Sequence, residues 1–163
     1  MLIALISDIH DHEMHLIEAL READKCGCRH LLCMGDLSGL NTLRLLRDIW
    51  PHPIDLVFGN NEDDRKSHLS LASGMRDLHH HGTEGDLSLG GRRIFITHHM
   101  EDAAHAVEKQ LYDAVFFGHT HVQEQLMIRR TLVANPGEIC GNRCPAGFAV
   151  YNTDTNEVAM RRL

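Results

Sequence analysis

The sequence predicts an α/β fold made of strand–helix units. In the first 60 residues, short apolar runs alternate with segments whose apolar residues recur every three to four positions. This alternation is typical of parallel strands joined by helices. From about residue 85 onward the pattern changes to closely spaced short strands. A length of 163 residues is that of one ordinary domain, which we expect to span residues 1–163.

The first half of the chain contains three predicted strands and two predicted helices. Buried strands are predicted at the apolar runs 1–7, 30–34 and 54–58. Helical spacing of apolar residues predicts a helix of about three turns over 14–23. It predicts a second helix over 40–49, which ends before a proline.

The second half is richer in strands. The pair Gly90-Gly91 predicts a hairpin between strands at 87–89 and 92–97. Helical spacing predicts a third helix over 101–111. Further strands are predicted at 114–117, 125–128, 131–134, 148–151 and 158–161. Residues 62–85 match neither the helical nor the strand pattern of apolar residues clearly.

Composition excludes several classes of protein. The 16 Lys and Arg residues against 23 Asp and Glu give a formal charge of −7, which argues against nucleic-acid and anionic-membrane partners. No segment approaches the ~20 apolar residues of a membrane span, and the N-terminus lacks the pattern of a signal peptide. We therefore expect a cytoplasmic protein. The five cysteines lack zinc-finger spacing and are interpreted as reduced thiols, with an accessory metal or redox site as the alternative.

Polar residues with metal-binding side chains follow five of the predicted strands. Ligands in open α/β sheets bind outside the carboxyl ends of the strands, so these side chains can converge on one place. Taken singly, each motif is weak evidence, since a Gly-Asn pair can be only a turn. Together they place seven donors at strand ends: Asp8, His10, Asp36, Asn60, His98, His119 and His121.

Seven donors favour two metal ions over one, because they are too many for one tetrahedral zinc. Mixed carboxylate, amide and imidazole donors suit Mn²⁺, with Fe, Zn, Ni or Co as alternatives, better than Ca²⁺ or Cu(I). Asp36 has the central place in sequence order and is the candidate for a carboxylate shared by both ions. Two such ions can stabilise an in-line displacement, with a water between them as the nucleophile.

The order of these motifs resembles the calcineurin-like metallophosphoesterase superfamily. Asn135-Pro136-Gly137 is similar to a turn of its compact bacterial and archaeal phosphodiesterase branch. The resemblance implies a four-layer α-β-β-α sandwich with two sheets packed face to face. It also implies a dinuclear site, with Asp36 shared between two sets of ligands. One set adds Asp8, His10 and His121, and the other adds Asn60, His98 and His119. The residues expected to act in catalysis are Asp36, Asn60, His98 and Asn61.

The sequence departs from the family pattern at positions that concern substrate more than metal. Asn61 stands where many members have a histidine, and an amide cannot supply a proton at neutral pH. His98-His99-Met100 replaces the usual His-Gly-His. Asp11 and His12 replace a small residue and Asn, and Glu138 replaces a serine. Metal binding is therefore expected to be intact.

Two other features have competing interpretations. The tract His79-His80-His81 is more typical of a solvated loop than of a metal site. Arg65 follows Asn61 closely; a surface charge is slightly favoured over a phosphate contact.

We expect a metal-dependent phosphoesterase, most simply a phosphodiesterase, that acts on a small phosphoester. The alternative is a scaffold of the same fold, similar to a retromer subunit, but such a scaffold would be free to lose the seven ligands. We also expect a homo-oligomer.

Overall fold

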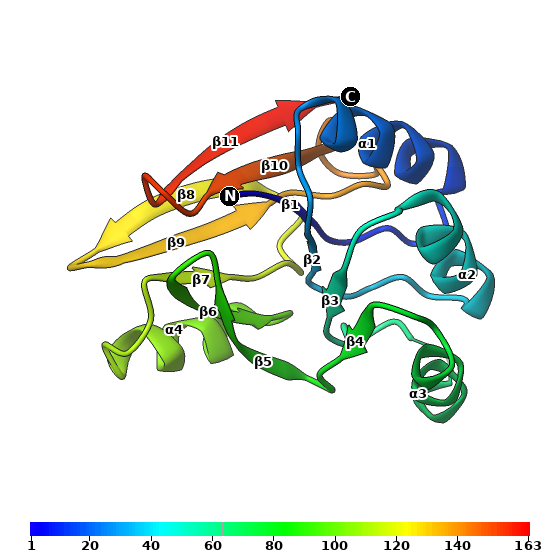
Figure 1. Ribbon diagram of the computed structural model, residues 1–163, viewed down its shortest axis with the longest axis horizontal. Coiled ribbons are helices and arrows are strands. Elements are labelled where there is room, and N and C mark those ends of the chain that lie inside the picture. Colours follow the sequence, from blue (N-terminus) through cyan, green and yellow to red (C-terminus); the bar gives the residue numbers. More distant parts are fainter. Residues whose placement is uncertain (63) are drawn as a thin grey trace.

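The computed structural model describes residues 1–62 and 64–163 and consists of two mixed β-sheets packed between helices (Figure 1). The first sheet has the strand order β11-β10-β1-β2-β3-β4, and the second has the order β5-β6-β7-β9-β8. Helices α1, α2 and α3 lie on the side of the first sheet, and α4 lies on the side of the second. This is the four-layer α-β-β-α arrangement that the sequence resemblance implies.

The first sheet contains the N-terminal strands and the chain's last two. Its strands are β1 (Leu2–Ile6), β2 (Leu31–Cys33), β3 (Ile54–Leu56), β4 (Leu78–His80), β10 (Gly147–Asn152) and β11 (Glu157–Arg162). Strands β1 to β4 run parallel, while β10 pairs antiparallel with both β1 and β11. The helices on its outer face are α1 (Glu13–Lys25), α2 (Leu40–Ile49) and α3 (Arg65–Ser73).

The second sheet is built from the middle of the chain. Its strands are β5 (Glu84–Leu89), β6 (Arg92–Thr97), β7 (Ala114–Phe116), β8 (Gln123–Ile128) and β9 (Thr131–Pro136). Strands β6, β7 and β9 run parallel, and the edge strands β5 and β8 are antiparallel to their neighbours. Helix α4 (Met100–Glu108) covers its outer face.

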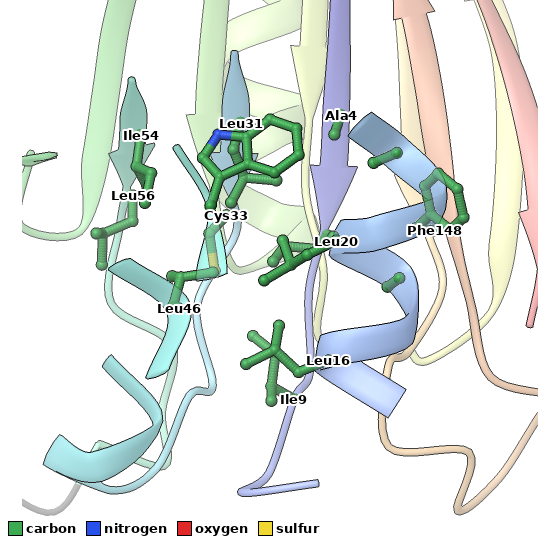
Figure 2. Close-up of a cluster of buried hydrophobic side chains, with 14 of the residues drawn as sticks. Ala4, Ile9, Leu16, Leu20, Leu31, Cys33, Leu46, Ile54, Leu56 and Phe148 are labelled. Carbon is green, nitrogen blue, oxygen red and sulfur yellow. The ribbon is translucent and has the colours of Figure 1, made fainter. Parts of the chain in front are cut away.

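Alternation along the strands divides the core into three apolar layers. In β1, Ala4 and Ile6 point toward the helices, whereas Ile3 and Leu5 point toward the second sheet. Figure 2 shows the helix-facing layer, where Leu16 and Leu20 of α1 and Leu46 of α2 lie over the strands of the first sheet. Both faces of β1 are buried, which explains why it is an uninterrupted apolar run in the sequence.

Within the region 62–85, which sequence patterns do not resolve, residues 65–85 include α3, β4 and the start of β5. Polar side chains stand among its apolar ones: His68 is one of the two buried residues of α3, and β4 has the sequence Leu-His-His. The interpretation of His79-His80-His81 as a solvated loop is wrong, because the first two residues are in β4. His80 packs against Phe58, and His81 binds the buried Asp55.

The third predicted helix ends earlier than expected. Helix α4 stops at Glu108, and Gln110 adopts a left-handed conformation with φ of 54°. Leu111, which helical spacing placed on the apolar face, lies outside the helix and is exposed.

In the described part of the chain, no helix is long and apolar enough to cross a membrane. All five cysteines are free thiols.

Candidate metal centre

The carboxyl ends of strands from both sheets meet at one edge of the sandwich. Asp8, Asp36 and Asn60 follow β1, β2 and β3, while His98 follows β6 and His119 and His121 follow β7. A pocket of about 400 Å³ opens there. Its lining residues are His10, Asp36, Asn60, Asn61, His119, His121, Asn142 and Arg143. Five of the seven predicted ligands therefore line one cavity, and Asp8 and His98 lie directly beneath them, as the distances below show.

One carboxylate oxygen of Asp36 stands between two histidines. Asp36 Oδ2 lies 3.6 Å from His10 Nε2 and 3.4 Å from His98 Nε2. His98 Nε2 is also 3.1 Å from Asn60 Oδ1. Asp36 Oδ2 thus lies between ring nitrogens of two candidate ligands, one on each side.

Asp8 completes the cluster on the other side. Its Oδ1 lies 3.3 Å from His121 Nε2 and 3.9 Å from His10 Nε2. Its Oδ2 accepts a 3.0 Å hydrogen bond from the backbone N–H of His119. The same carboxylate thus faces the cluster with one oxygen and holds the loop after β7 with the other.

The backbone at this edge adopts conformations that most side chains avoid. Asp8, His10, Asp36, His119 and His121 all have φ between 46° and 66°. Left-handed conformations at non-glycine residues cost of order 1–3 kcal/mol each and concentrate at functional sites. The surrounding structure must therefore compensate, and the result is that five side chains are aimed into one small volume.

Two glycines are required by close approach at the centre. A Cβ at Gly59 would overlap the Asp36 carboxylate, and a Cβ at Gly118 would overlap the hydroxyl of Ser7. These contacts explain the Gly-Asn and Gly-His pairs of the sequence as packing requirements beside the ligands. Glycine is needed at both positions only for lack of space, since neither glycine has a positive φ.

The donor set fits divalent metal ions. Asp8 Oδ1 and His10 Nε2 are buried and have no hydrogen-bond partner within the described chain. Buried polar atoms are normally satisfied, so these two face a missing partner. One donor atom each from Asp8, His10 and Asp36 lies within 4.8 Å of the others.

Two of the four candidate histidine ligands have their second ring nitrogen bound by the protein. His98 Nδ1 hydrogen-bonds to the Met34 carbonyl at 2.6 Å, and His121 Nδ1 hydrogen-bonds to Glu138 Oε2 at 2.6 Å. Both rings therefore present Nε2 to the cluster. Binding of the second ring nitrogen by a carbonyl or carboxylate is the usual way that proteins orient histidines that ligate metals.

The two carboxyl groups of the cluster have opposite electrostatic environments. Burial raises the pKa of Asp8. Burial acts in the same direction on Asp36, but hydrogen bonds from His98 and Asn61 outweigh it and hold the pKa of Asp36 well below its ordinary value. Asp36 is therefore ionised at neutral pH even without a bound cation.

Asn61 binds Asp36 with two groups. Its backbone N–H donates to Oδ1 at 2.8 Å, and its side-chain amide donates to Oδ2 at 2.7 Å. The side chain also lines the pocket, so its second amide hydrogen remains available to a bound molecule. The residue expected to contact substrate thus also positions the central carboxylate.

Two departures from the family pattern have structural roles. Asp11 Oδ1 accepts hydrogen bonds from the N–H of Gly39 at 2.9 Å and from the hydroxyl of Thr42, at the N-terminus of α2. His12 Nδ1 accepts from the N–H of His15 at 3.3 Å and caps α1. These residues support the helices that flank the centre.

Glu138 is a functional candidate that sequence reasoning recorded only as a departure. It is fully buried and accepts hydrogen bonds from His121, from Cys140 Sγ at 2.7 Å and from the N–H of Arg143 at 2.6 Å. Burial would raise its pKa, but these donors and the N–H of Cys144 hold the pKa at about 2. Glu138 thus joins the ligand His121 to the loop that carries Arg143. No motif signals this link in the sequence.

Cys140 lies closer to the centre than its spacing suggested. Ligand atoms of His10, His121 and Cys140 lie within 4.8 Å of one another. Burial and the neighbouring Glu138 raise the pKa of the Cys140 thiol to about 12. It is therefore a protonated hydrogen-bond donor here.

The Asn-Pro-Gly segment holds the loop after β7. The Asn135 amide donates to the Gly118 carbonyl at 2.8 Å and to Thr120 Oγ1 at 2.9 Å. This loop carries His119 and His121. Most of the segment belongs to β9, and only Gly137, with φ of 81°, makes the predicted turn.

Comparison with known proteins agrees with this geometry. Residues 1–156 match the model of the calcineurin-like phosphoesterase superfamily domain. The chain is 28% identical over 146 residues to phosphodiesterase MJ0936 of Methanocaldococcus jannaschii, covering 86% of each protein. The structure superimposes on that of a novel archaeal phosphodiesterase with a TM-score of 0.92, at 25% identity and full coverage of both chains.

More distant structures share the fold. The phosphoesterase YfcE of E. coli has a TM-score of 0.71 at 18% identity, covering 99% of this chain and 98% of that one. The zinc complex of Vps29 from Entamoeba histolytica has a TM-score of 0.68 at 20% identity, covering 97% and 89%. With the family model matched over nearly its whole length, the chain belongs to the calcineurin-like phosphoesterase superfamily and is a metal-dependent hydrolase of phosphoester bonds.

Proposed function

We propose that this protein is a phosphodiesterase that acts on a small phosphoester at a dinuclear metal centre. The observation that carries the proposal is the position of Asp36 Oδ2, 3.6 Å from His10 Nε2 and 3.4 Å from His98 Nε2. A carboxylate placed between two donor sets is what two cations need in order to share a ligand. The two phosphodiesterases that resemble the chain at 28% and 25% identity support diester hydrolysis.

The proposed ligands form two sets around Asp36. One set is Asp8, His10 and His121, and the other is Asn60, His98 and His119, with Asp36 common to both. When bound, divalent ions would polarise the phosphoryl oxygens and lower the pKa of water. We propose Mn²⁺ as the ion, since carboxylate, amide and imidazole donors suit it.

The chain's own residues bind and orient the ester. The pocket of about 400 Å³ admits a small ester. Asn61 points one amide hydrogen at Asp36 and has a second to offer to an ester oxygen. Asp36, already ionised, needs no proton loss before it can bind cations.

We also propose a cytoplasmic location and a homo-oligomeric assembly. Five free cysteines, three of them buried, suit a reducing compartment. The edge strand β8, whose Leu126, Met127 and Ile128 are exposed, supports self-association. The scaffold function is less well supported, because the described chain brings all seven candidate ligands together at one edge.

A comparison of three alanine variants with the native protein tests the dinuclear centre. Asp36→Ala should abolish hydrolysis of bis(p-nitrophenyl) phosphate and reduce bound metal from about two equivalents to below one. His121→Ala should affect mainly one ion. Asp48→Ala, an exposed carboxylate of α2, is the matched control and should change neither. Elemental analysis after Mn²⁺ saturation that finds at most one ion in the native protein would refute the dinuclear proposal. Near-normal turnover and metal content in Asp36→Ala would refute the shared ligand.

A further inference from the structure

One cationic side chain lines the pocket beside the candidate metal ligands. The residues that line it are histidines, asparagines, Asp36 and Arg143. Arg143 belongs to the loop between β9 and β10, far from the ligands in sequence. Its guanidinium makes no ion pair or hydrogen bond with any residue that the structure describes, although the protein has a formal charge of −7. An unpaired arginine at the entrance to such a pocket is available to an anion.

The loop that carries Arg143 is anchored at its backbone. The N–H groups of Arg143 and Cys144 both donate to Glu138 Oε1, and Glu138 is fully buried. Gly141 makes the turn before them with φ of 73°. The Cα of Arg143 is therefore fixed relative to His121, which binds the other oxygen of Glu138. An anchored backbone favours binding by the unpaired side chain, because less loop entropy is lost when a ligand binds.

The other arginine near the centre is committed elsewhere. Arg65, the phosphate-contact candidate of the sequence, donates from its guanidinium to the Gly59 carbonyl at 2.7 Å. Its guanidinium carbon also lies 5.0 Å from the centre of the Phe58 ring. Arg65 does not line the pocket. It supports the loop that carries Asn60, and Arg143 is left as the pocket's cation.

We propose that Arg143 binds the phosphate group of the substrate. The inference rests on the proposed function, because it assumes that a phosphoester enters this pocket. The planar guanidinium offers two parallel N–H donors that match two oxygens of a phosphate. Asn61 also lines this cavity and can offer an amide hydrogen to the same phosphate. Arg143 therefore adds charge recognition to a pocket whose other donors are neutral or ligate metal.

This role has a consequence for substrate choice. A phosphomonoester carries up to two negative charges at neutral pH and a phosphodiester carries one. A contact that depends on charge must therefore contribute more to binding of the monoester and of inorganic phosphate than to binding of the diester. Arg143 would thus extend the substrate range of the enzyme to the more highly charged esters.

The test compares Arg143→Met and Arg143→Lys with the native, metal-loaded protein. Arg76→Met is the matched control, since Arg76 is 94% exposed and, among the described residues, forms an ion pair only with its neighbour Asp77. Inorganic phosphate is titrated in a calorimeter, and kcat and KM are measured for p-nitrophenyl phosphate and bis(p-nitrophenyl) phosphate. Metal content is measured for every variant.

For Arg143→Met we expect the Kd of phosphate and the KM of the monoester to rise roughly 10–100-fold, the usual effect of one charge-assisted hydrogen-bond pair. The KM of the diester should rise less, kcat should change little, and metal content should stay the same. Arg143→Lys should retain part of the affinity, and Arg76→Met should match the native protein.

Two results would overturn the inference. Unchanged phosphate affinity and KM in Arg143→Met would show that the side chain touches no phosphate. A parallel loss of metal and kcat would show that Arg143 only supports the centre. Failure of the proposed function has a different signature: the native protein would hydrolyse neither ester. In that case the phosphate titration alone decides the role of Arg143.

Discussion

At the scale of single residues, the centre depends on side chains that hold ligands as much as on the ligands themselves. His98 and His121 are each oriented through Nδ1, by the Met34 carbonyl and by Glu138. A ring oriented in this way loses little entropy when a cation binds to Nε2. The buried acceptors therefore contribute to metal affinity without touching the metal.

Glu138→Gln tests this contribution. The substitution keeps the size of the side chain but removes the charge and replaces one acceptor oxygen with a donor. We expect metal affinity to fall about 10–100-fold, since loss of such a supporting partner typically has this effect. Mn²⁺ titration of the chelator-treated protein measures it. Asp86→Asn, an exposed carboxylate that does not line the pocket, should leave affinity unchanged. Equal affinities in Glu138→Gln and the native protein would contradict the role of Glu138.

We propose that Asn61 sets the dependence of rate on the leaving group. An amide cannot donate a proton to a departing alkoxide, and general acid catalysis is typically worth ~10²–10⁴-fold. We expect a steep decrease in rate as the leaving-group pKa rises. Asn61→His should raise turnover of alkyl phosphoesters more than of nitrophenyl esters, as measured across a series of esters. A flat dependence in the native protein would indicate that another residue, such as His99 or His12, supplies the proton. Equal gains for both classes would mean that position 61 only positions the substrate.

At the scale of elements, prediction succeeded where buried positions are apolar. The runs of β1, β2 and β3 and the stripes of α1 and α2 are visible because both sheet faces and one helix face bury aliphatic side chains. Sequence patterns do not reveal helix α3 and strand β4, because the buried His68 and the half-buried His80 interrupt their apolar positions. Burial lowers the pKa of His80 to about 4, so it is neutral and packs like an aromatic residue.

The hairpin between β5 and β6 offers a matched pair of glycines. Gly90 and Gly91 have φ of 56° and 77°. Alanine at either position is therefore strained, at a cost of about 1 kcal/mol. A Cβ at Gly90 would also overlap the side chain of Thr153, whereas one at Gly91 meets no atom within 4 Å. Gly90→Ala should therefore destabilise the protein clearly more than Gly91→Ala in urea unfolding. Equal losses would show that Thr153 moves aside at no cost.

Three strands of the first sheet share one buried carboxylate. Asp55 of β3 hydrogen-bonds to His30 Nε2, next to β2, at 2.6 Å and to His81 Nε2, next to β4, at 2.5 Å. Burial alone would raise the pKa of Asp55, but these two partners outweigh it and lower the pKa to about 2. The ionised carboxylate therefore stabilises the folded state at neutral pH.

Asp55→Asn should lower the free energy of unfolding by about 2 kcal/mol at pH 7, since one unit of pKa corresponds to about 1.4 kcal/mol. Because the folded pKa is below the unfolded one, this stability is present above about pH 4 and is lost as the pH falls toward 2. The difference in the free energy of unfolding between Asp55→Asn and the native protein should therefore shrink as the pH falls from about 4 to 2. Urea unfolding in the presence of a chelator measures it, with Asp48→Asn as the control. A difference that stays constant down to pH 2 would contradict the ionic origin.

At the scale of the whole molecule, the candidate ligands could be predicted because of topology. Parallel strands in both sheets place all their carboxyl ends at one edge, so residues from position 8 to position 121 meet there. Glu138 and Arg143 could not be predicted, because their positions depend on how the loop after β9 folds over that edge. No periodicity or spacing encodes such a loop contact.

Each of the two sheets also ends in edge strands, among them β11 and β8. Strand β8 is an edge of the second sheet, and its Leu126 and Met127 are 45% and 56% exposed. A groove of about 720 Å³ between β8 and β11 is lined by these residues and by Leu132 and Val158. An exposed apolar edge strand is a template for association, and monomers normally block it with charges or proline. These features favour the homo-oligomer that we propose.

Light scattering coupled to size-exclusion chromatography at micromolar concentration tests the assembly. We expect a dimer or tetramer for the native protein. Leu126→Glu should shift it to the monomer, because a charge on β8 disfavours burial of that edge. Leu111→Glu is the matched control, since Leu111 is similarly exposed but lies in the loop after α4. Both variants should keep esterase activity, because neither residue lines the pocket at the metal centre. A monomeric native protein would refute the assembly. An oligomer that Leu126→Glu leaves intact would show that the interface does not involve β8.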